Sequence, residues 1–222
     1  MVPVITIDGP SGSGKGTIAA RVAQKLGFRT LDSGALYRLV GHAVSKAAVS
    51  LDDLETISQI ARNLDVEFRT GQVLLDGEDV SKAIRSETAG NMASKVAAIP
   101  QVRAALLDWQ KAYAGPPGLV ADGRDMGTVV FPDAQVKIFL TASAEERAMR
   151  RYKQLKEKEI DANLADLTAE IEERDARDRN RSVAPLRPAV GAIEIDSTGL
   201  GIDEVVMRVL SLATKVWPDL AV

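Results

Sequence analysis

The stretch Gly9-Pro-Ser-Gly12-Ser-Gly14-Lys15-Gly16-Thr17 decides the fold class that we expect for this chain. It follows an apolar run, Val4 to Ile7, and opens a periodic stretch, Thr17 to Leu26. Between a strand and a helix, such a loop points backbone N–H groups at an anion, and the helix dipole adds to their attraction. The lysine brings a full positive charge to the β- and γ-phosphates. The loop is therefore predicted to bind a nucleoside triphosphate through Gly9, Pro10, Ser11, Gly12, Ser13, Gly14, Lys15, Gly16 and Thr17.

The residue after the lysine departs from the usual pattern of this loop. A hydroxyl is common there, whereas the chain has Gly16 and carries its hydroxyl on Thr17. Thr17 is thus the candidate neighbour of a Mg²⁺ ion, and the other ligands of the metal stay unassigned. The loop alone fits switches, motors and small-molecule kinases, and a length of 222 residues favours a kinase.

Short apolar runs alternate with longer periodic stretches along the rest of the chain. This alternation is typical of parallel strands joined by crossover helices. The predicted strands are Val4 to Ile7, Phe28 to Leu31, Leu119 to Ala121, Val136 to Leu140 and Ile193 to Ile195. The predicted helices are Thr17 to Leu26, Leu36 to Lys46, Gln101 to Tyr113, Glu145 to Lys158 and Asp203 to Val216. Gly27 is predicted to cap the first helix, and Asp203 to open the last.

One region breaks this alternation. Between Asp65 and Ser81, apolar and polar residues alternate with period two around a turn that contains Gly71. This pattern predicts a small antiparallel hairpin, which we expect as an insertion on the α/β core.

Composition excludes several classes of function. Lys and Arg number 28 against 31 Asp and Glu, so a formal charge of −3 argues against broad attraction to nucleic acid or to anionic membranes. The chain has no cysteine and a single histidine, His42, which excludes thiol chemistry and histidine-rich metal sites. Without a basic leader or a long apolar run, we expect a cytoplasmic protein.

Arginines follow several of the predicted strands and helices. Asp32-Ser-Gly-Ala-Leu-Tyr-Arg38 and Asp122-Gly-Arg-Asp-Met-Gly-Thr128 come directly after strands, and Arg174 to Arg181 adds four more arginines. Parallel strands bring their carboxyl ends to one edge of a sheet, where open α/β folds bind ligands. Guanidinium groups there can neutralise a transferring phosphoryl group, whose charge is spread over several oxygens.

Two of the arginine-bearing segments also have plainer interpretations. Taken alone, the run from Arg174 to Arg181 is equally typical of a solvated helix end. Arg150 and Arg151 lie in a helix of mixed charge. This helix could be a lid that closes over the phosphates or an ordinary exposed surface, and the sequence favours neither interpretation.

The scarcity of histidine and cysteine indicates the kind of acceptor. An alcohol would need a base to take its proton, whereas a phosphate monoester with a second pKa of about 6 already presents an anionic oxygen. Charge neutralisation and alignment then suffice for transfer.

Together, the phosphate loop, the two strand-end motifs and the Arg174 to Arg181 run resemble the bacterial cytidylate kinase family. The resemblance extends from Val4 to the last helix. It implies transfer of a phosphoryl group from ATP to CMP or dCMP with Mg²⁺. It also implies a parallel five-stranded sheet flanked by helices, a small nucleotide-binding insert with an antiparallel sheet, and a short helical lid. The expected ranges are 1–55, 96–144 and 185–222 for the core, 56–95 for the insert and 145–184 for the lid and arginine-rich helix.

The resemblance also implies roles for single residues. The catalytic groups would be Lys15, Arg38, Arg124 and Arg181, and Arg150 and Arg174 would join the loop in holding ATP. The sugar and acceptor phosphate would be held by Ser33, Tyr37, Arg38, Arg124, Asp178 and Arg181. The cytosine would be recognised by Ser94, Arg103 and Asp125, because a carboxylate accepts from the cytosine N4 amino group, where uracil has an oxygen.

Two other functions remain open at this point. The chain could phosphorylate a different small metabolite, or it could be a nucleotide-dependent regulatory or RNA-binding module that uses the Arg174 to Arg181 run. The acidic balance weighs against the second. We expect a monomer that acts on small nucleotides, without nucleic acid or membrane partners.

Overall fold

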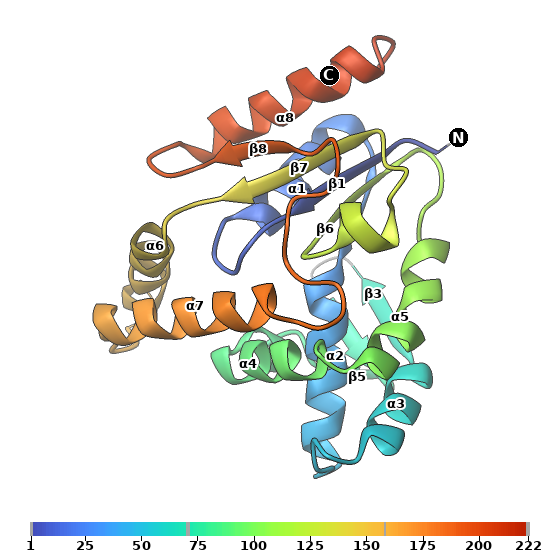
Figure 1. Cartoon of the computed structure of the whole chain (residues 1–222), viewed down its shortest axis with the longest axis vertical. Coiled ribbons are helices and arrows are strands. Elements are labelled where there is room, and N and C mark those ends of the chain that lie inside the picture. The colour runs from blue at the N-terminus through green and yellow to red at the C-terminus, as the bar shows by residue number, and fades with distance from the viewer. Residues whose placement is uncertain (1, 70–71, 158, 221–222) are drawn as a thin grey trace. The chain divides into compact units, whose positions relative to one another are not determined.

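A computed structural model describes residues 2–69, 72–157 and 159–220 of the chain. The chain divides into two compact units. Met1–Asp32 and Tyr113–Val222 form the first, named here the phosphate-loop unit, and Ser33–Ala112 form the second, the helical unit. Figure 1 labels helices and strands of both units.

A five-stranded parallel sheet forms the centre of the phosphate-loop unit. Its strands are β1 (Val4–Asp8), β2 (Arg29–Asp32), β6 (Leu119–Gly123), β7 (Val136–Thr141) and β8 (Ile193–Asp196), in the spatial order β2-β6-β1-β7-β8. The parallel register pairs Asp8 with Gly123 and Asp32 with Asp122, so polar residues end neighbouring strands at the same edge. The predicted parallel sheet is confirmed.

Burial explains why these strands read as continuous apolar runs. Every residue of β1 and β6 is buried, as expected for central strands of a sheet that is covered on both faces. The helices α1 (Lys15–Leu26) and α8 (Ile202–Val216) share one core with the sheet. That core includes Ile5, Ile7, Ile18, Val22, Ile138, Leu140, Val206 and Val209.

Two further helices of this unit pack against each other. They are α6 (Ala144–Lys156) and α7 (Leu164–Arg179), whose shared apolar cluster is Ala148, Leu155 and Leu167. Each begins with a side-chain cap: Ser143 accepts a hydrogen bond from the backbone of α6, and Asn163 accepts from that of α7. A short π-helical turn, Met126–Val130, follows β6.

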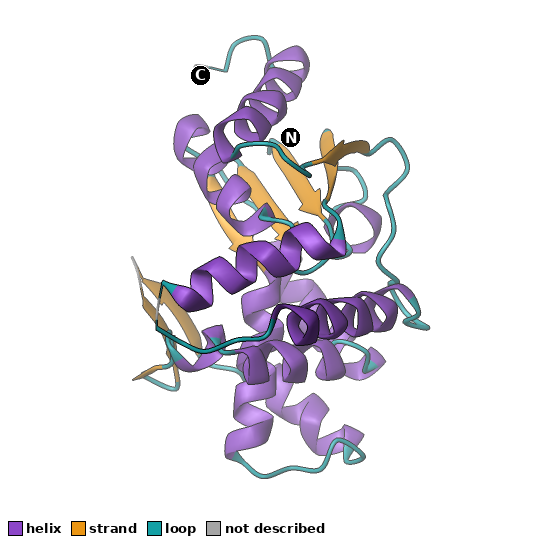
Figure 2. Ribbon diagram, turned by 90° about the vertical axis from the view of Figure 1, so that its left-hand side faces the viewer, coloured by secondary structure: helices purple, strands orange, loops and turns teal. Residues whose placement is uncertain are grey.

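The helical unit is described by itself. It contains α2 (Ser33–Lys46), α3 (Leu54–Arg62), a 3₁₀ turn (Ala83–Arg85), α4 (Glu87–Val96) and α5 (Pro100–Ala112). The antiparallel strands β3 (Val66–Arg69), β4 (Gln72–Leu75) and β5 (Glu78–Asp79) form its small sheet, drawn with the other strands in orange in Figure 2. The predicted hairpin is therefore present, although its turn at residues 70 and 71 lies outside the described ranges.

Several boundaries differ from the sequence-based expectation. The last helix begins at Ile202 rather than at Asp203, which lies in its first turn. The helix expected to end at Lys158 ends at Lys156, and residue 158 is outside the described ranges. Gly27 does cap α1, with a positive φ of 66°.

Two helices of the helical unit were not predicted. They are α3 and α4, whose N-caps are Asp53 and Ser86. The compact unit Ser33–Ala112 also takes in α2 and α5, beyond the insert expected at 56–95. The nucleotide-binding role of that insert stays a prediction. No helix in the described ranges has both the length and the apolar character needed to cross a membrane.

Candidate functional site

The phosphate loop connects β1 to α1, as the sequence pattern predicts. Gly12 and Gly14 have positive φ angles of 74° and 87°, a region that side chains with a Cβ rarely adopt. Gly9 is required for a different reason, because a Cβ there would lie 2.1 Å from the carbonyl oxygen of Leu140 in β7. Local backbone geometry therefore explains three of the loop glycines.

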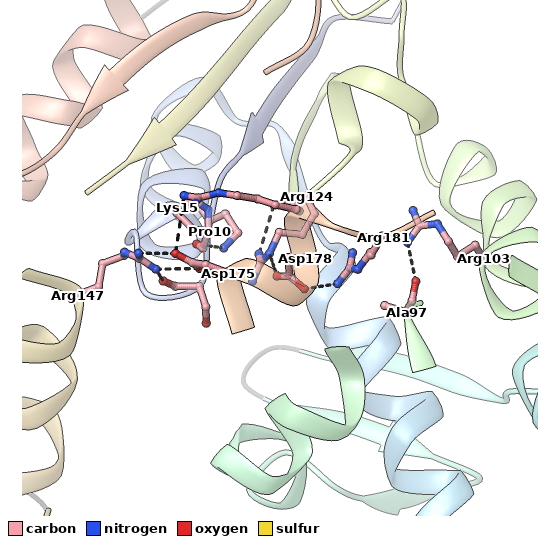
Figure 3. A network of polar contacts seen from close by, with 12 residues as sticks. Pro10, Lys15, Ala97, Arg103, Arg124, Arg147, Asp175, Asp178 and Arg181 are labelled. Atoms are coloured by element: carbon pink, nitrogen blue, oxygen red, sulfur yellow. Dashed lines mark hydrogen bonds and ion pairs between the residues drawn. The ribbon is translucent and has the colours of Figure 1, made fainter. Parts of the chain in front are cut away.

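Lys15 is buried at the start of α1. Its Nζ donates a hydrogen bond to the carbonyl of Pro10 at 3.0 Å, across the loop (Figure 3). Burial lowers its pKa to about 7, and the nearby charge of Arg124 adds to this effect, against the attraction of Asp122. A polyanion bound in the loop would offset this cost and favour the charged lysine.

Asp122 ends strand β6 beside this lysine. Burial raises its pKa to about 8, and the neighbouring carboxylate of Asp32 raises it further, while Lys15 and Arg124 act in the opposite direction. Its Oδ2 lies 3.8 Å from the position that a Cβ of Gly16 would take. Asp122 thus projects toward the first turn of α1.

Asp8 joins the end of β1 to the loop after β6. Its two carboxylate oxygens accept hydrogen bonds from the backbone amides of Met126 and Gly127, both at 2.8 Å. Burial raises the pKa of Asp8 to about 6, partly opposed by these two hydrogen bonds. This contact fixes the chain immediately after Arg124 and Asp125.

Asp178 holds two of the predicted acceptor-phosphate arginines. The Nε of Arg124 donates to its Oδ2 at 2.8 Å, and Arg181 forms a second ion pair with its Oδ1 (Figure 3). Burial alone would raise the pKa of Asp178, but the charges of Arg124 and Arg181 outweigh this effect and bring it to about 2. The carboxylate of Asp178 is therefore ionised at neutral pH.

Arg174 lies close enough to act on both parts of this arrangement. Its charge lowers the pKa of Lys15 and also that of Asp178. The structure thus brings Lys15, Arg124, Arg174, Asp178 and Arg181 together within the phosphate-loop unit. Such a concentration of positive charge suits the binding of phosphates.

The arginines of α6 contact the outer side of the phosphate loop. The buried Arg147 donates from Nη1 to the carbonyl of Ser11 at 2.9 Å. Arg150 donates from Nη1 to the carbonyl of Ser13 at 3.5 Å and from Nη2 to that of Ser197 at 2.8 Å. Arg150 is therefore not an ordinary exposed surface residue, because its guanidinium donates to backbone carbonyls. The other interpretation, a lid that closes over phosphates, stays a prediction.

The remaining predicted site residues lie in the helical unit. Ser33 donates to Gln110 at 2.8 Å, and Arg38 donates to the carbonyls of Ile84 and Ser86 at 2.7 and 3.0 Å. The guanidinium of Arg103 lies 5.5 Å from the centre of the Tyr37 ring and donates to Ala97. Ser94 is buried on α4. Within its unit, the structure therefore pairs Tyr37 with Arg103, whereas Asp125 belongs to the phosphate-loop unit.

The donors near Lys15 fit a magnesium ion. Thr17 is exposed on the first turn of α1, and Asp122 projects toward the same turn. A hydroxyl and a carboxylate are hard oxygen ligands, which Mg²⁺ combines with waters and phosphate oxygens.

Sequence reasoning missed four residues of this site. Asp8 and Asp122 are acidic residues at strand ends, a signal that was present but was not assigned. Arg147 and Asp175 gave no such signal, because each lies in a helical stretch of mixed charge where several neighbours look alike.

A parallel sheet with a phosphate loop after its central strand, a buried loop lysine and clustered arginines defines an α/β protein of the phosphate-loop kinase class. A family model described as cytidylate kinase matches residues 5–215. The chain belongs to the cytidylate kinase family and is an enzyme of the kinase class.

The sequences of two curated relatives agree with this assignment. A cytidylate kinase of Stutzerimonas stutzeri is 62% identical over 216 residues, which cover 95% of this chain and 94% of that protein. A cytidylate kinase of Aeromonas hydrophila is 56% identical over 225 residues, covering 100% of this chain and 98% of that one. Among solved structures, a shikimate kinase of Bacteroides thetaiotaomicron is 14% identical with a TM-score of 0.45, covering 96% of this chain and 99% of that chain.

Proposed function

We propose that the chain transfers the γ-phosphoryl group of ATP to CMP or dCMP, giving ADP and CDP or dCDP. The observation that carries this proposal is the joint arrangement of Lys15, Arg124, Arg174 and Arg181 around the phosphate loop and Asp178. Membership of the cytidylate kinase family supports the choice of acceptor.

The donor nucleotide binds at the phosphate loop. Backbone N–H groups and the positive end of α1 attract the β- and γ-phosphates, and the buried Lys15 adds a positive charge. Arg150 and Arg174 complete the donor side.

The acceptor phosphate is neutralised by Arg38, Arg124 and Arg181, with Ser33 and Tyr37 beside it. Asp178 acts on this side by keeping Arg124 and Arg181 in fixed positions before substrate arrives, and it also contacts the ribose. Arginines positioned in this way can raise the rate of phosphoryl transfer by roughly 10³ to 10⁵.

No side chain is needed as a general base. The acceptor is a phosphate monoester with a second pKa of about 6, so its attacking oxygen is already anionic at neutral pH. The single histidine, His42, is half-buried on α2, outside the predicted set of site residues. Alignment and charge neutralisation supply the catalysis, with an in-line transfer between the two phosphates.

Asp125, Ser94 and Arg103 recognise the cytosine. The carboxylate of Asp125 accepts from the N4 amino group, and the other two side chains donate to O2 or N3. Against uracil, the same carboxylate faces an oxygen, and this pairing is unfavourable.

Thr17 and Asp122 would hold Mg²⁺ together with waters and phosphate oxygens. When bound, the ion supplies positive charge to the phosphates of ATP. We also expect the enzyme to act as a monomer on free nucleotides in the cytoplasm, without nucleic acid or membrane partners.

A panel of acceptors tests this proposal. The pure protein is incubated with ATP, Mg²⁺ and one of CMP, dCMP, UMP, AMP or dTMP, and ADP formation is followed. Strong turnover is expected with CMP and dCMP, much weaker turnover with UMP and little with AMP. Equal rates with AMP or dTMP would contradict the acceptor assignment. ATP binding without transfer to any of these nucleotides would indicate a kinase for another metabolite.

A further inference from the structure

Arg147 on α6 makes several hydrogen bonds and has no part in the reaction proposed above. Its Nε donates to the carbonyls of Ala142 and Ser143 at 3.0 and 3.3 Å. Its Nη1 donates to the carbonyl of Ser11 at 2.9 Å. Only 3% of the residue is exposed, so this guanidinium is not an ordinary surface group.

Asp175 on α7 completes the bonding of Arg147. Its two oxygens accept from Nη1 and Nη2 of Arg147 at 3.1 and 2.5 Å, a two-pronged ion pair (Figure 3). Both side chains are almost completely buried, with 3% and 6% exposed. Such a pair gives little net stability for its desolvation cost, so stability alone does not explain its presence.

The side chain of Arg147 also packs against the phosphate loop. A Cβ on Gly12 would lie 3.3 Å from the Cβ of Arg147 and 3.7 Å from its Cγ. Arg147 therefore bonds to the carbonyl of Ser11 and lies close to the next loop residue, Gly12. A loop carbonyl that is bound to Arg147 cannot turn toward an anion in the loop, which leaves that position to the N–H groups.

We propose that Arg147 and Asp175 are positioning residues that hold the phosphate loop in its anion-binding conformation before nucleotide arrives. A loop rich in glycine has many accessible conformations, and ordering it on binding weakens affinity. An anchor in the free protein removes that cost. The inference rests on the proposed function only for the statement that ATP binds at the phosphate loop.

The pair also connects the loop to the acceptor side of the phosphate-loop unit. Asp175 and Asp178 are three residues apart on α7 and therefore lie on one face of that helix. Asp175 binds Arg147, and Asp178 binds Arg124 and Arg181. One helix thus fixes both the loop anchor and two of the arginines proposed for the acceptor phosphate.

The test compares two ligands that share the loop but differ elsewhere. Affinities for ATP and for inorganic tripolyphosphate are measured by titration calorimetry in the intact protein and in Arg147→Lys and Asp175→Asn. Lysine keeps the charge but cannot make the two-pronged contact and the Ser11 contact together. Both variants are expected to bind both ligands about tenfold more weakly or worse, because the ordering cost returns.

Three comparisons separate positioning from a merely structural role. Glu173→Gln is the matched control, since it makes the same chemical change on α7 in an exposed ion pair with Arg177, and it should leave both affinities unchanged. Asp175→Glu restores a carboxylate and should recover part of the tripolyphosphate affinity. Thermal unfolding without ligand identifies variants that are folded at the titration temperature.

The possible outcomes are distinct. Folded variants with unchanged tripolyphosphate affinity would overturn the inference and leave the ion pair a structural one. A loss for ATP alone would also overturn it, because Arg147 would then contact the nucleoside directly. An intact protein that binds neither ligand would contradict the donor site of the proposed function instead.

Discussion

The ionisable groups around Lys15 differ in the direction of their pKa shifts. Burial lowers the pKa of Lys15 to about 7 and raises that of Asp122 to about 8, whereas the two arginines beside Asp178 bring its pKa to about 2. The first two groups therefore titrate near neutral pH in the free protein, and Asp178 does not. A bound polyanion changes the protonation of the first two only.

The first prediction concerns proton uptake. The negative charge of a triphosphate favours the protonated forms of Lys15 and Asp122 and so raises the pKa of both. When ATP binds without Mg²⁺ at about pH 8, the protein should therefore take up protons. Calorimetric titrations in two buffers with different heats of ionisation measure this uptake. Lys15→Met should show a smaller uptake. Enthalpies that do not depend on the buffer would contradict the assigned pKa directions.

The second prediction concerns base recognition. Asp125 is buried, with 2% of the residue exposed, and it immediately follows Arg124. Asp125→Ala removes the acceptor for the cytosine N4 amino group, so the ratio of kcat/KM for CMP over UMP should fall by about 10- to 100-fold. Steady-state kinetics with both nucleotides measure the ratio, and an unchanged ratio would remove Asp125 from base recognition.

At the scale of elements, α7 shows why a charge run cannot be interpreted from composition alone. Its arginines have different environments: the side chain of Arg181, just beyond the helix, is 4% exposed, and that of Arg179 is 63% exposed. The run is therefore partly a solvated face and partly a buried ion-pair network. Helical periodicity separates the two faces, and only the structure shows which face is buried.

The helices and strands also differ in how well the sequence predicts them. The five strands were predictable because central parallel strands are continuous apolar runs, and the phosphate loop because its glycines serve backbone geometry. The helices α3 and α4 were missed because both lie beside the hairpin, largely in the range assigned to the insert, although the residues of α3 have a clear amphipathic pattern. Arg147 could not be singled out, because its partners Ser11 and Asp175 are far away in sequence.

The third prediction concerns the loop as an element. Gly9→Ala places a Cβ 2.1 Å from the carbonyl oxygen of Leu140, so β1 and β7 must shift apart. We expect a loss of about 3 kcal/mol in the free energy of unfolding, typical of overpacking. Denaturant unfolding measures the loss.

Gly201→Ala is the matched control for this substitution. No atom lies within 4 Å of a Cβ at Gly201, and its φ of −72° suits any residue. The control should lose less than about 1 kcal/mol. Equal effects of the two substitutions would show that the close approach at Gly9 does not determine stability.

At the scale of the whole molecule, the proposed reaction needs residues of both units. Lys15, Arg124, Asp125, Asp178 and Arg181 belong to the phosphate-loop unit, whereas the other predicted acceptor residues, Ser33, Tyr37, Arg38, Ser94 and Arg103, belong to the helical unit.

The fourth prediction follows from this division. An analogue that joins adenosine and cytidine through five phosphates should bind more tightly than ATP or CMP alone, because it spans both nucleotide positions. At about 1,000 times its Kd, it should stabilise the protein by about 4 kcal/mol. Thermal unfolding measures the gain. A gain in stability no larger than the gain with ATP at the same concentration would contradict the joint action of the two units.

The central claim is direct transfer between two nucleotides held at the same time. The most direct test uses an ATP analogue whose terminal phosphorus is a chiral phosphorothioate, with CMP as the acceptor, and determines the configuration of the thiophosphorylated product. In-line transfer in a single step predicts inversion at phosphorus. Retention would contradict the account, because it requires an intermediate in which the phosphoryl group is first attached to the enzyme.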